Sequence, residues 1–401
     1  MNYDVIGDIH GHADALEALL GHLGYRQNGG AWRHPERQAL FVGDFIDRGP
    51  QQRESVDVVR RMVDAGSAQA IMGNHEFNAI GWFLPDPECP GEHLRKHSSA
   101  RYGNRNRHQH QAFLTAVEGT PLHEELVSWF LTLPLFLDLP ELRLVHACWH
   151  PAALAYLRPY LTVDNRLKIE TMVEASREPE HEAEKDMPEL TVFKAAEAVL
   201  KGIEVPLPAP HKFYDKDGQE RDRVRVRWWD NEAMDYRRAA MLPPEERVGF
   251  PQTQIPPHVL IGHDGAKPIF VGHYWLTGTP ALLSDKVACV DYSVAKGGKL
   301  VAYRWDSEPF LENSKLDWVS YESTAAIAEQ HFVAFAHCRD CPGRKRGPIR
   351  SDHLSRKEGS ATWVGPRSRE GSARHPRLGR QHGRYPHRGA RVRASQGLTS
   401  R

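Results

Sequence analysis

The stretch Ala39-Leu40-Phe41-Val42-Gly43-Asp44-Phe45-Ile46-Asp47-Arg48-Gly49-Pro50 joins an apolar run to a polar loop, and the same pattern occurs on either side of it. Tyr3 to Ile6 leads into Gly7-Asp8-Ile9-His10, and Ala68 to Met72 leads into Gly73-Asn74-His75-Glu76. Amphipathic helices are predicted after the first two loops, over residues 13–23 and 56–63. Strands that alternate with helices favour parallel pairing. Since loops at the carboxyl ends of parallel strands meet at one sheet edge, we expect the three polar loops to converge in one cleft.

The later part of the chain predicts further helices and strands. Residues 85–133 are predicted to be mostly helical, and Leu142 to Val145 is a strand that runs into His146. Residues 151–257 are interpreted as an insertion over the cleft, with helices over 164–177 and 190–201. Apolar runs joined by short turns then predict strands in antiparallel pairing. These runs are 259–261, 269–271, 281–283, 287–290 and 299–304.

The composition excludes several classes of protein. Apolar residues make up 40% of the 401 positions and charged residues 26%, as in a globular protein. No apolar run approaches the roughly 20 residues of a membrane-spanning helix, and the first residues lack the pattern of an export signal. Five scattered cysteines suit a reducing compartment better than a disulfide framework. We therefore expect a cytoplasmic protein with no membrane partner.

The end of the chain differs in charge from the rest. Residues 343–401 contain 16 Lys and Arg against 3 Asp and Glu, an excess of +13, whereas residues 1–342 carry −13. With few apolar residues to bury, this segment is predicted to be a basic disordered tail after a linker over 321–342. The tail could attract nucleic acid through its charge, but an idle extension is preferred because it has hardly any aromatic residues. Cys338 and Cys341 form a lone pair of thiols, interpreted as two exposed cysteines at the start of the tail rather than as a zinc or redox site.

The polar loops combine the side chains that bind divalent metal ions. Carboxylate, amide and imidazole groups follow the strands, and no cysteine joins them, which favours Mn²⁺, Fe²⁺ or Zn²⁺ over a thiolate-rich structural site. The candidates are Asp8, His10, Asp44, Asn74, His146 and a later Gly-His histidine. Six ligands suit two ions about 3.5–4 Å apart, an arrangement that supports in-line displacement at phosphorus. Taken singly, each loop could equally be a helix cap or a turn.

The three motifs together resemble a known family, the calcineurin-like metallophosphoesterases. Asp8-Ile9-His10-Gly11, Gly43 to Gly49 and Gly73-Asn74-His75-Glu76 are similar to its first three motifs, and their spacings of 36 and 30 residues also fit. Within the family, the chain is most similar to the branch of serine/threonine protein phosphatases and symmetrical diadenosine tetraphosphate hydrolases. The resemblance implies an α/β fold of two facing mixed β-sheets flanked by helices, a metallophosphoesterase-type sandwich, over residues 1–320.

The resemblance also implies roles for individual residues. Asp8 and His10 would hold one ion, Asp44 would bridge, and the second ion would be held by Asn74, His146 and His273. His75 would be the general acid, oriented by Asp47, and Arg48 would grip the phosphate. The nucleophile would be a metal-bridging hydroxide. Mn²⁺ is the preferred ion, with Fe, Zn, Co and Ni as alternatives.

Two choices stay open at this point. His263 and His273 both follow a strand-like run and a glycine, and His273 is preferred because it lies 18 residues before Asp291, a distance that resembles the family better. The second choice is the substrate. Two arginine clusters could grip a polyphosphate or nucleotide, although such clusters are more often solvated surface; they are Arg101, Arg105 and Arg107, and Arg223, Arg225 and Arg227.

The sequence thus predicts a metal-dependent phosphoesterase, a hydrolase of phosphate monoesters or phosphoanhydrides. Its substrate would be a phosphorylated small molecule, a nucleotide or a phosphoprotein. A nuclease or cyclic-nucleotide phosphodiesterase is the alternative within the same chemistry, because a metal pair also cleaves diesters. An alternative of another class is a nucleic-acid-binding protein that acts through its basic tail.

Overall fold

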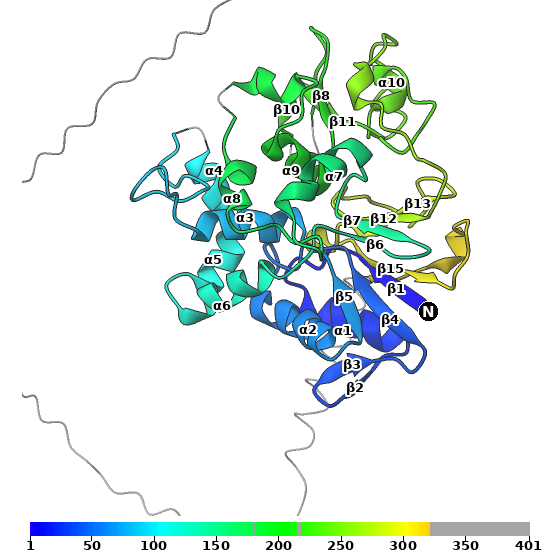
Figure 1. The fold of residues 1–401 in the computed structure, drawn as a ribbon. Helices are drawn as coiled ribbons and strands as arrows, with labels where there is room; N and C mark the ends of the chain where they lie inside the picture. Colours follow the sequence, from blue (N-terminus) through cyan, green and yellow to red (C-terminus); the bar gives the residue numbers. More distant parts are fainter. Residues whose placement is uncertain (101, 180, 215–217, 321–401) are drawn as a thin grey trace, which may run out of the picture. The chain divides into compact units, whose positions relative to one another are not determined.

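The structure, a computed structural model, describes residues 1–320 except 101, 180 and 215–217. The predicted linker, the basic tail and Cys338 and Cys341 lie outside the described residues. Two β-sheets form the centre of the described part (Figure 1). The larger sheet has the order β14-β15-β1-β4-β5, with β16 also paired to β15. Its strands are β1 (Asn2–Ile6), β4 (Arg37–Phe41), β5 (Ala68–Ala70), β14 (Asp291–Tyr292), β15 (Lys299–Trp305) and β16 (Leu316–Ser320).

The second sheet has the order β13-β12-β7-β6. Its strands are β6 (Phe136–Asp138), β7 (Arg143–Val145), β12 (Ile269–Val271) and β13 (Val287–Cys289). Both sheets are mixed, because β1, β4 and β5 pair in parallel while β15 runs antiparallel to β1, and β12 pairs in parallel with β7 and β13 while β6 runs antiparallel to β7. The predicted class of two mixed sheets with flanking helices is therefore confirmed.

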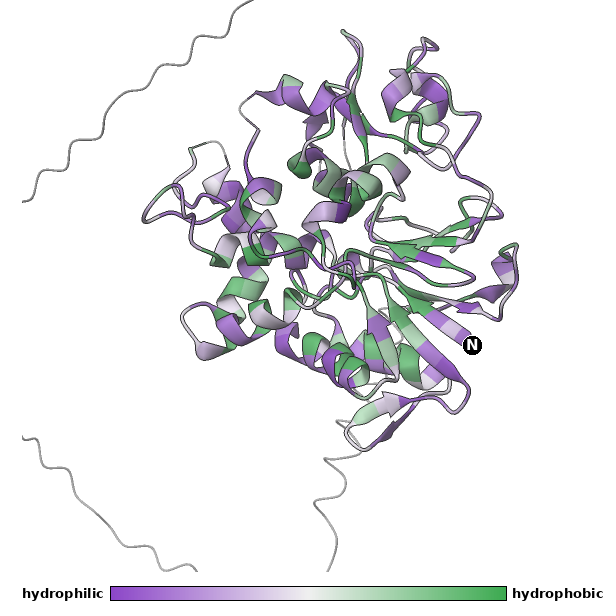
Figure 2. Cartoon of the chain, in the orientation of Figure 1, coloured by the Kyte–Doolittle hydropathy of each residue, from purple (hydrophilic) through white to green (hydrophobic). Residues whose placement is uncertain are grey.

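Alternation along the strands explains why the two sheets face each other. Val5 pairs with Leu40, and both side chains belong to a buried cluster that also contains Leu144 and Phe270 of the second sheet. The next residue of β1, Ile6, points to the opposite face and packs in a cluster with the helices. Successive strand residues face opposite sides of a sheet, so each apolar strand serves both layers. Figure 2 shows the sheet strands as largely hydrophobic and the helix surfaces as mixed.

Helices cover the outer face of the larger sheet and the loop edge. Helices α1 and α2 lie below the larger sheet in Figure 1, on the side away from the second sheet. Helices α3 to α6 and α7 to α9 lie toward the edge at which the polar loops emerge. The helices are α1 (Ala13–His22), α2 (Gln52–Asp64), α3 (Asn74–Phe83), α4 (Gly103–Gln109), α5 (Gln111–Val117), α6 (Pro121–Phe130), α7 (Pro151–Leu157), α8 (Thr171–Ser176), α9 (Val192–Lys201) and α10 (Tyr236–Ala239).

The region predicted to be an insertion, residues 151–257, contributes helices α7 to α10 and short strands. These strands are β8 (Glu204–Pro206), β9 (Phe213–Tyr214), β10 (Glu220–Arg221) and β11 (Arg223–Arg225), and they pair only with each other. Part of the region has a small apolar cluster of its own, with Val205, Val224 and Phe250 among its buried members. A further hairpin, β2 (Arg26–Asn28) and β3 (Ala31–Arg33), stands apart from the main sheets. The insertion boundaries themselves stay a prediction.

Several sequence expectations were wrong in detail. Residues 259–261 form no strand, because Pro256 and Pro257 begin a 3₁₀ turn, Pro257–Val259. Residues 281–283 do not form a strand either. The backbone N–H of Ala281 donates to the Tyr292 hydroxyl and that of Leu282 donates to Asn313 Oδ1. These backbone groups therefore bond to side chains instead of to a neighbouring strand. The predicted helix over 164–177 is limited to α8.

The expected antiparallel pairing holds for the run 299–304, which is β15 and pairs antiparallel with β14 and β16, two strands that were not predicted. It fails for β12 and β13, which are parallel to each other. Their connection, residues 272–286, is long enough for the crossover of about a dozen residues that parallel strands need. This arrangement brings the carboxyl end of β12 to the same edge as that of β7. The loops after β1, β4, β7 and β12 therefore meet.

Candidate metal and catalytic site

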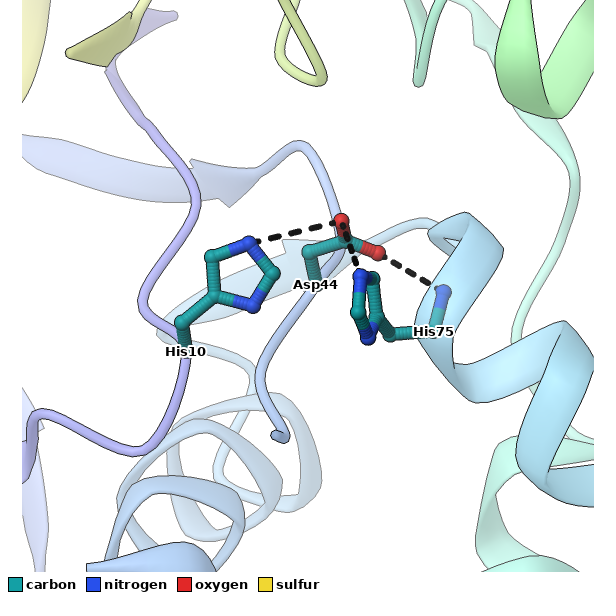
Figure 3. A group of neighbouring side chains, drawn as sticks. All are labelled: His10, Asp44 and His75. Atoms are coloured by element: carbon teal, nitrogen blue, oxygen red, sulfur yellow. Dashed lines mark hydrogen bonds and ion pairs between the residues drawn. The ribbon is translucent and has the colours of Figure 1, made fainter. Parts of the chain in front are cut away.

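Asp44 lies at the centre of the loop edge. It follows β4, is buried, and adopts a left-handed backbone with φ of 54°. Its Oδ2 atom lies 3.3 Å from Nε2 of His146, 3.7 Å from Nε2 of His10 and 3.9 Å from Nε2 of His75. Its Oδ1 atom accepts a hydrogen bond of 2.9 Å from the backbone N–H of His75, at the start of α3 (Figure 3). One carboxylate thus contacts side chains from three other loops.

The close approach of α3 to Asp44 requires a glycine. A Cβ at Gly73 would lie 2.2 Å from Asp44 Oδ1 and 2.3 Å from its backbone nitrogen. Glu76 fixes the same contact from the other side, because its carboxylate accepts backbone N–H bonds from Asp44 (2.9 Å), Phe45 (2.8 Å) and Gly73 (3.0 Å). Glu76 therefore ties the β4 loop to the helix and holds Asp44 in place without facing the cluster itself.

Two histidines present one ring nitrogen each to the cluster. Nδ1 of His10 donates to the carbonyl of Ile46 at 2.9 Å, and Nδ1 of His146 donates to the carbonyl of Val42 at 2.7 Å. Such bonds fix the tautomer and leave Nε2 with its lone pair toward Asp44, as in metal-binding histidines. Burial, and then the charge of His75, lower the pKa of His10 to about 3, so this ring is held in the neutral form that binds metal ions.

Asn74 and His273 complete a second group around Asp44 and His146. Asn74 Oδ1 lies 2.7 Å from Nδ1 of His273 and 3.2 Å from Nε2 of His146. Ligands at about 2.1 Å from one ion lie roughly 3 Å apart, so this spacing suits shared coordination. Burial, followed by the charge of Arg225, holds the pKa of His273 well below its ordinary value. By contrast, the pKa of His146 is raised overall. Burial lowers this pKa, but the charge of Asp44 and a hydrogen bond to Asp44 outweigh burial.

Asp8 connects the two groups. Its Oδ2 accepts the backbone N–H of His273 at 2.9 Å, and its Oδ1 is buried without a hydrogen-bond partner. Nε2 of His10 is likewise buried and has no hydrogen-bond partner. Burial, and then the negative charges of Asp291 and Asp44, raise the pKa of Asp8 well above its ordinary value. Buried carboxylates and neutral imidazoles whose ligand atoms lack partners fit divalent cations, which offset the charge and take the open ligand atoms.

The predicted acid and its partner lie beside this cluster. Nδ1 of His75 donates to Oδ2 of Asp47 at 2.5 Å, while Nε2 of His75 faces Asp44. Burial lowers the pKa of His75, but the charge of Asp44 and the bond to Asp47 raise it overall. A charged imidazole held by a carboxylate can give a proton to a leaving oxygen.

A second histidine, which sequence analysis did not identify, also binds Asp47. Nδ1 of His110, a fully buried residue that precedes α5, donates to the same Oδ2 of Asp47 at 2.7 Å. One oxygen of Asp47 thus accepts hydrogen bonds from two imidazoles. Burial raises the pKa of this carboxyl, but the two histidines, His110 more than His75, lower it below its ordinary range. His110 belongs to no recognisable motif, and only the packing of α4 and α5 against α3 brings it here.

Arg48 is exposed at the mouth of the site. Its guanidinium lies 3.8 Å from the centre of the Trp275 ring, a cation–π distance. Lys296 lies over the same ring at 5.2 Å, and His10 packs edge-on against it at 5.9 Å between ring centres. Trp275, whose role the sequence did not indicate, therefore joins the predicted phosphate-gripping arginine to the Asp44 cluster.

The structure brings together all six predicted ligand residues and separates them from His263. His263 donates its backbone N–H to Asn231 Oδ1 at 2.8 Å, and its Nε2 lies 3.1 Å from the carbonyl oxygen of Lys267. Within the described ranges, its ring is in none of the groups of side chains that could hold an ion. The geometry therefore favours His273.

An open cavity of about 2510 Å³ extends from the cluster to the region of residues 151–257. Its lining includes Asn74, His75 and His273 of the cluster, and also Arg223, Arg225 and Arg227. Its size exceeds what one phosphate group occupies. Among the described residues, no helix is both long and apolar enough to cross a bilayer.

Comparison with known proteins agrees with this geometry. The family model of the calcineurin-like phosphoesterases matches residues 1–157. A bis(5'-nucleosyl)-tetraphosphatase PrpE [asymmetrical] of Halalkalibacterium halodurans is 43% identical over 76 residues, which are 19% of this chain and 31% of that protein. The protein of the same name from Oceanobacillus iheyensis is 34% identical over 132 residues, 31% of this chain and 52% of that protein. The chain thus spans about half or less of the length of the relatives it matches.

Among solved structures, the cold-active protein-tyrosine phosphatase of a psychrophilic Shewanella species is 17% identical, with a TM-score of 0.41 over 78% of this chain and 80% of that one. The names of the tetraphosphatases specify the asymmetrical kind, whereas the motifs resemble protein phosphatases and symmetrical hydrolases. Residues 1–157 of this chain, which carry five of the six predicted ligands, match the family model of the calcineurin-like phosphoesterases.

Proposed function

We propose that this protein is a dinuclear metal-dependent phosphoesterase that hydrolyses phosphoanhydrides or phosphate monoesters, with dinucleoside polyphosphates as its preferred substrates. One observation carries the proposal: the Nε2 atoms of His10, His75 and His146 converge within 3.9 Å of one oxygen of Asp44, although they come from separate loops. The names of the relatives support the substrate class.

The proposed division of roles follows the two groups around Asp44. Asp8 and His10 would hold one divalent ion, and Asp44 would be shared by both ions. The second ion would be held by Asn74, His146 and His273. When bound, such ions polarise the phosphate oxygens and make water a nucleophile near neutral pH.

The remaining roles belong to side chains alone. His75 would protonate the leaving oxygen from Nε2, since Nδ1 is held by Asp47. Arg48, steadied by Trp275, would bind two phosphate oxygens with its planar guanidinium. The burial of Asp8, His10, Asp44 and His146 would limit access of bulk water to the ions.

The proposal is tested by metal removal and by Asp44→Asn. We expect the chelated protein to lose hydrolysis of diadenosine tetraphosphate and p-nitrophenyl phosphate, and Mn²⁺ to restore both. Asp44→Asn should lose bound metal, measured by elemental analysis, and activity, by at least about a thousandfold, as expected when charge stabilisation in the transition state is lost. Circular dichroism should remain unchanged. Full activity in the metal-free protein or in Asp44→Asn would refute the proposal.

A further inference from the structure

Arg95 is a partly buried cation whose hydrogen-bond partners are neutral side chains. It follows α3, and its backbone N–H donates to the carbonyl of Gly81 at 2.8 Å. Its guanidinium donates to Oδ1 of Asn78 and to Oδ1 of Asn106, while Nε has no partner. Among the described residues, no carboxylate lies within ion-pair distance of it. Burial lowers the pKa of Arg95 to about 10, although the more distant negative charges of Glu197, Glu178 and Asp47 act to raise it.

Arg105, on α4, is a second cation near Arg95. It is exposed, forms no ion pair with the described residues, and directly precedes Asn106, the residue that holds Arg95. Its positive charge also lowers the pKa of Arg95, by less than burial does and by less than the nearby carboxylates raise it. Two like charges so placed repel each other, and the repulsion is removed when an anion binds between them.

Other arginines nearby are neutralised, which sets this pair apart. Arg107 lies two residues further along α4 and forms an ion pair with Glu118 at 2.6 Å. Arg223 pairs with Asp186 at 2.6 Å. Of the predicted cluster around residue 105, Arg101 lies outside the described residues, and Arg107 does not line the cavity. Of the three arginines in this cluster, Arg105 is therefore the one described residue whose charge is left to bind a polyphosphate or nucleotide.

The pair lies close to the reacting end of the cavity. Asn78, which holds Arg95, is on α3 three residues after His75, so both side chains project from the same region of one helix. The charge of Arg95 also acts on His110, which is bonded to Asp47. Arg95, Arg105 and Asn78 line the same cavity as His75 and Asn74. An anion bound by the pair would therefore lie near the phosphate at the Asp44 cluster.

We propose that Arg95 and Arg105 form a second anion subsite, which binds a non-reacting phosphate group of a polyphosphate chain while another phosphate of the same chain reacts at the Asp44 cluster. This inference rests on the proposed phosphoesterase function and narrows its substrate to molecules with several linked phosphates. A monoester with one phosphate would occupy the cluster alone and leave the pair without an anion.

The matched variants are Arg105→Gln and Arg107→Gln, two exposed arginines of the same short helix. For Arg105→Gln we expect the KM for diadenosine tetraphosphate, divided by the KM for p-nitrophenyl phosphate, to rise about tenfold, as for the loss of one charged hydrogen bond. Arg107→Gln should leave this ratio unchanged. Arg95→Lys, which keeps the charge but loses the planar fork, should raise the ratio less than Arg105→Gln does.

Calorimetric titration with inorganic tripolyphosphate separates the subsite from catalysis. Arg105→Gln should weaken tripolyphosphate binding about tenfold, and Arg107→Gln should not. Equal KM changes for both substrates, or unchanged tripolyphosphate binding in Arg105→Gln, would overturn the subsite. Wild-type protein that binds tripolyphosphate through Arg105 but hydrolyses neither substrate would support the anion site and refute the proposed function.

Discussion

His110→Ala tests whether the second histidine on Asp47 positions the proposed acid. The change removes a 2.7 Å bond to Asp47 Oδ2, the oxygen that also holds His75 at 2.5 Å. Because Asp47 Oδ1 has no hydrogen-bond partner, the carboxylate would then be fixed by His75 alone and could rotate. Rotation would turn Nε2 of His75 away from the site beside Asp44, where a leaving oxygen would need its proton.

The size of the effect follows from the bond that is lost. A hydrogen bond to a charged group contributes about 1.5–3 kcal/mol. Every 1.4 kcal/mol corresponds to a factor of ten, so we expect kcat to fall about 10- to 100-fold where proton donation limits the rate. KM should change little, because His110 does not line the cavity.

The assay compares two aryl phosphates that differ in their need for a proton. Phenyl phosphate has a poor leaving group, whereas p-nitrophenyl phosphate has a good one, so His110→Ala should impair the first much more than the second. His110→Asn keeps an N–H donor near the position of Nδ1 and should recover most of the loss. An equal fall with both substrates, at unchanged metal content, would show that His110 only fills space. A wild-type rate on phenyl phosphate would also contradict the reasoning.

Two further changes test how the fold holds the site. Glu76→Gln would place an amide N–H against backbone N–H groups that now donate hydrogen bonds to the carboxylate. The free energy of unfolding in urea should therefore fall by about 2–4 kcal/mol. An unchanged urea midpoint would contradict the role assigned to Glu76. Asp4→Ala would remove a fully buried carboxylate bonded to Arg37 at 2.9 Å and to the Tyr25 hydroxyl at 3.0 Å. We expect the free energy of unfolding to fall by about 3 kcal/mol. This is the lower end of the range for a broken buried ion pair, because Arg37 keeps its ion pair with Asp306. A fall below about 1 kcal/mol would show that the pair contributes little to stability.

The cluster could be predicted because its signals are local. Each ligand directly follows an apolar run. Because β1, β4 and β5 are parallel, the loops after them lie at one edge of the sheet, and Asp8, Asp44 and Asn74 lie close together in space. His273 needed one further fact, that β12 is parallel to β7. The sequence favoured antiparallel pairing there, since periodicity identifies a strand but does not name its partner.

The residues that the sequence missed are held by long-range packing. His110 lies 63 residues after Asp47, and Asn106 of α4 accepts a hydrogen bond from Arg95, which lies in the loop before that helix. Neither contact leaves a periodic pattern or a motif, because each joins a polar helix surface to a loop that the sequence does not place. The arginine cluster around residue 105 could be identified in the sequence. The structure adds that Arg107 is neutralised by an ion pair with Glu118, which leaves Arg105 to bind an anion.

Backbone strain ties stability to the proposed chemistry. His10, Asp44 and His273 all have positive φ, between 48° and 69°, a conformation that non-glycine residues adopt at a cost and that is concentrated at functional sites. The carbonyl of Asp44 accepts the backbone N–H groups of Ile9 and His10, and Glu76 accepts that of Asp44. These bonds offset the strain, and among them the bond to Glu76 comes from a residue outside the set of proposed ligands. A variant of Glu76 should therefore lose metal affinity together with stability, whereas a variant of Arg48 should lose neither.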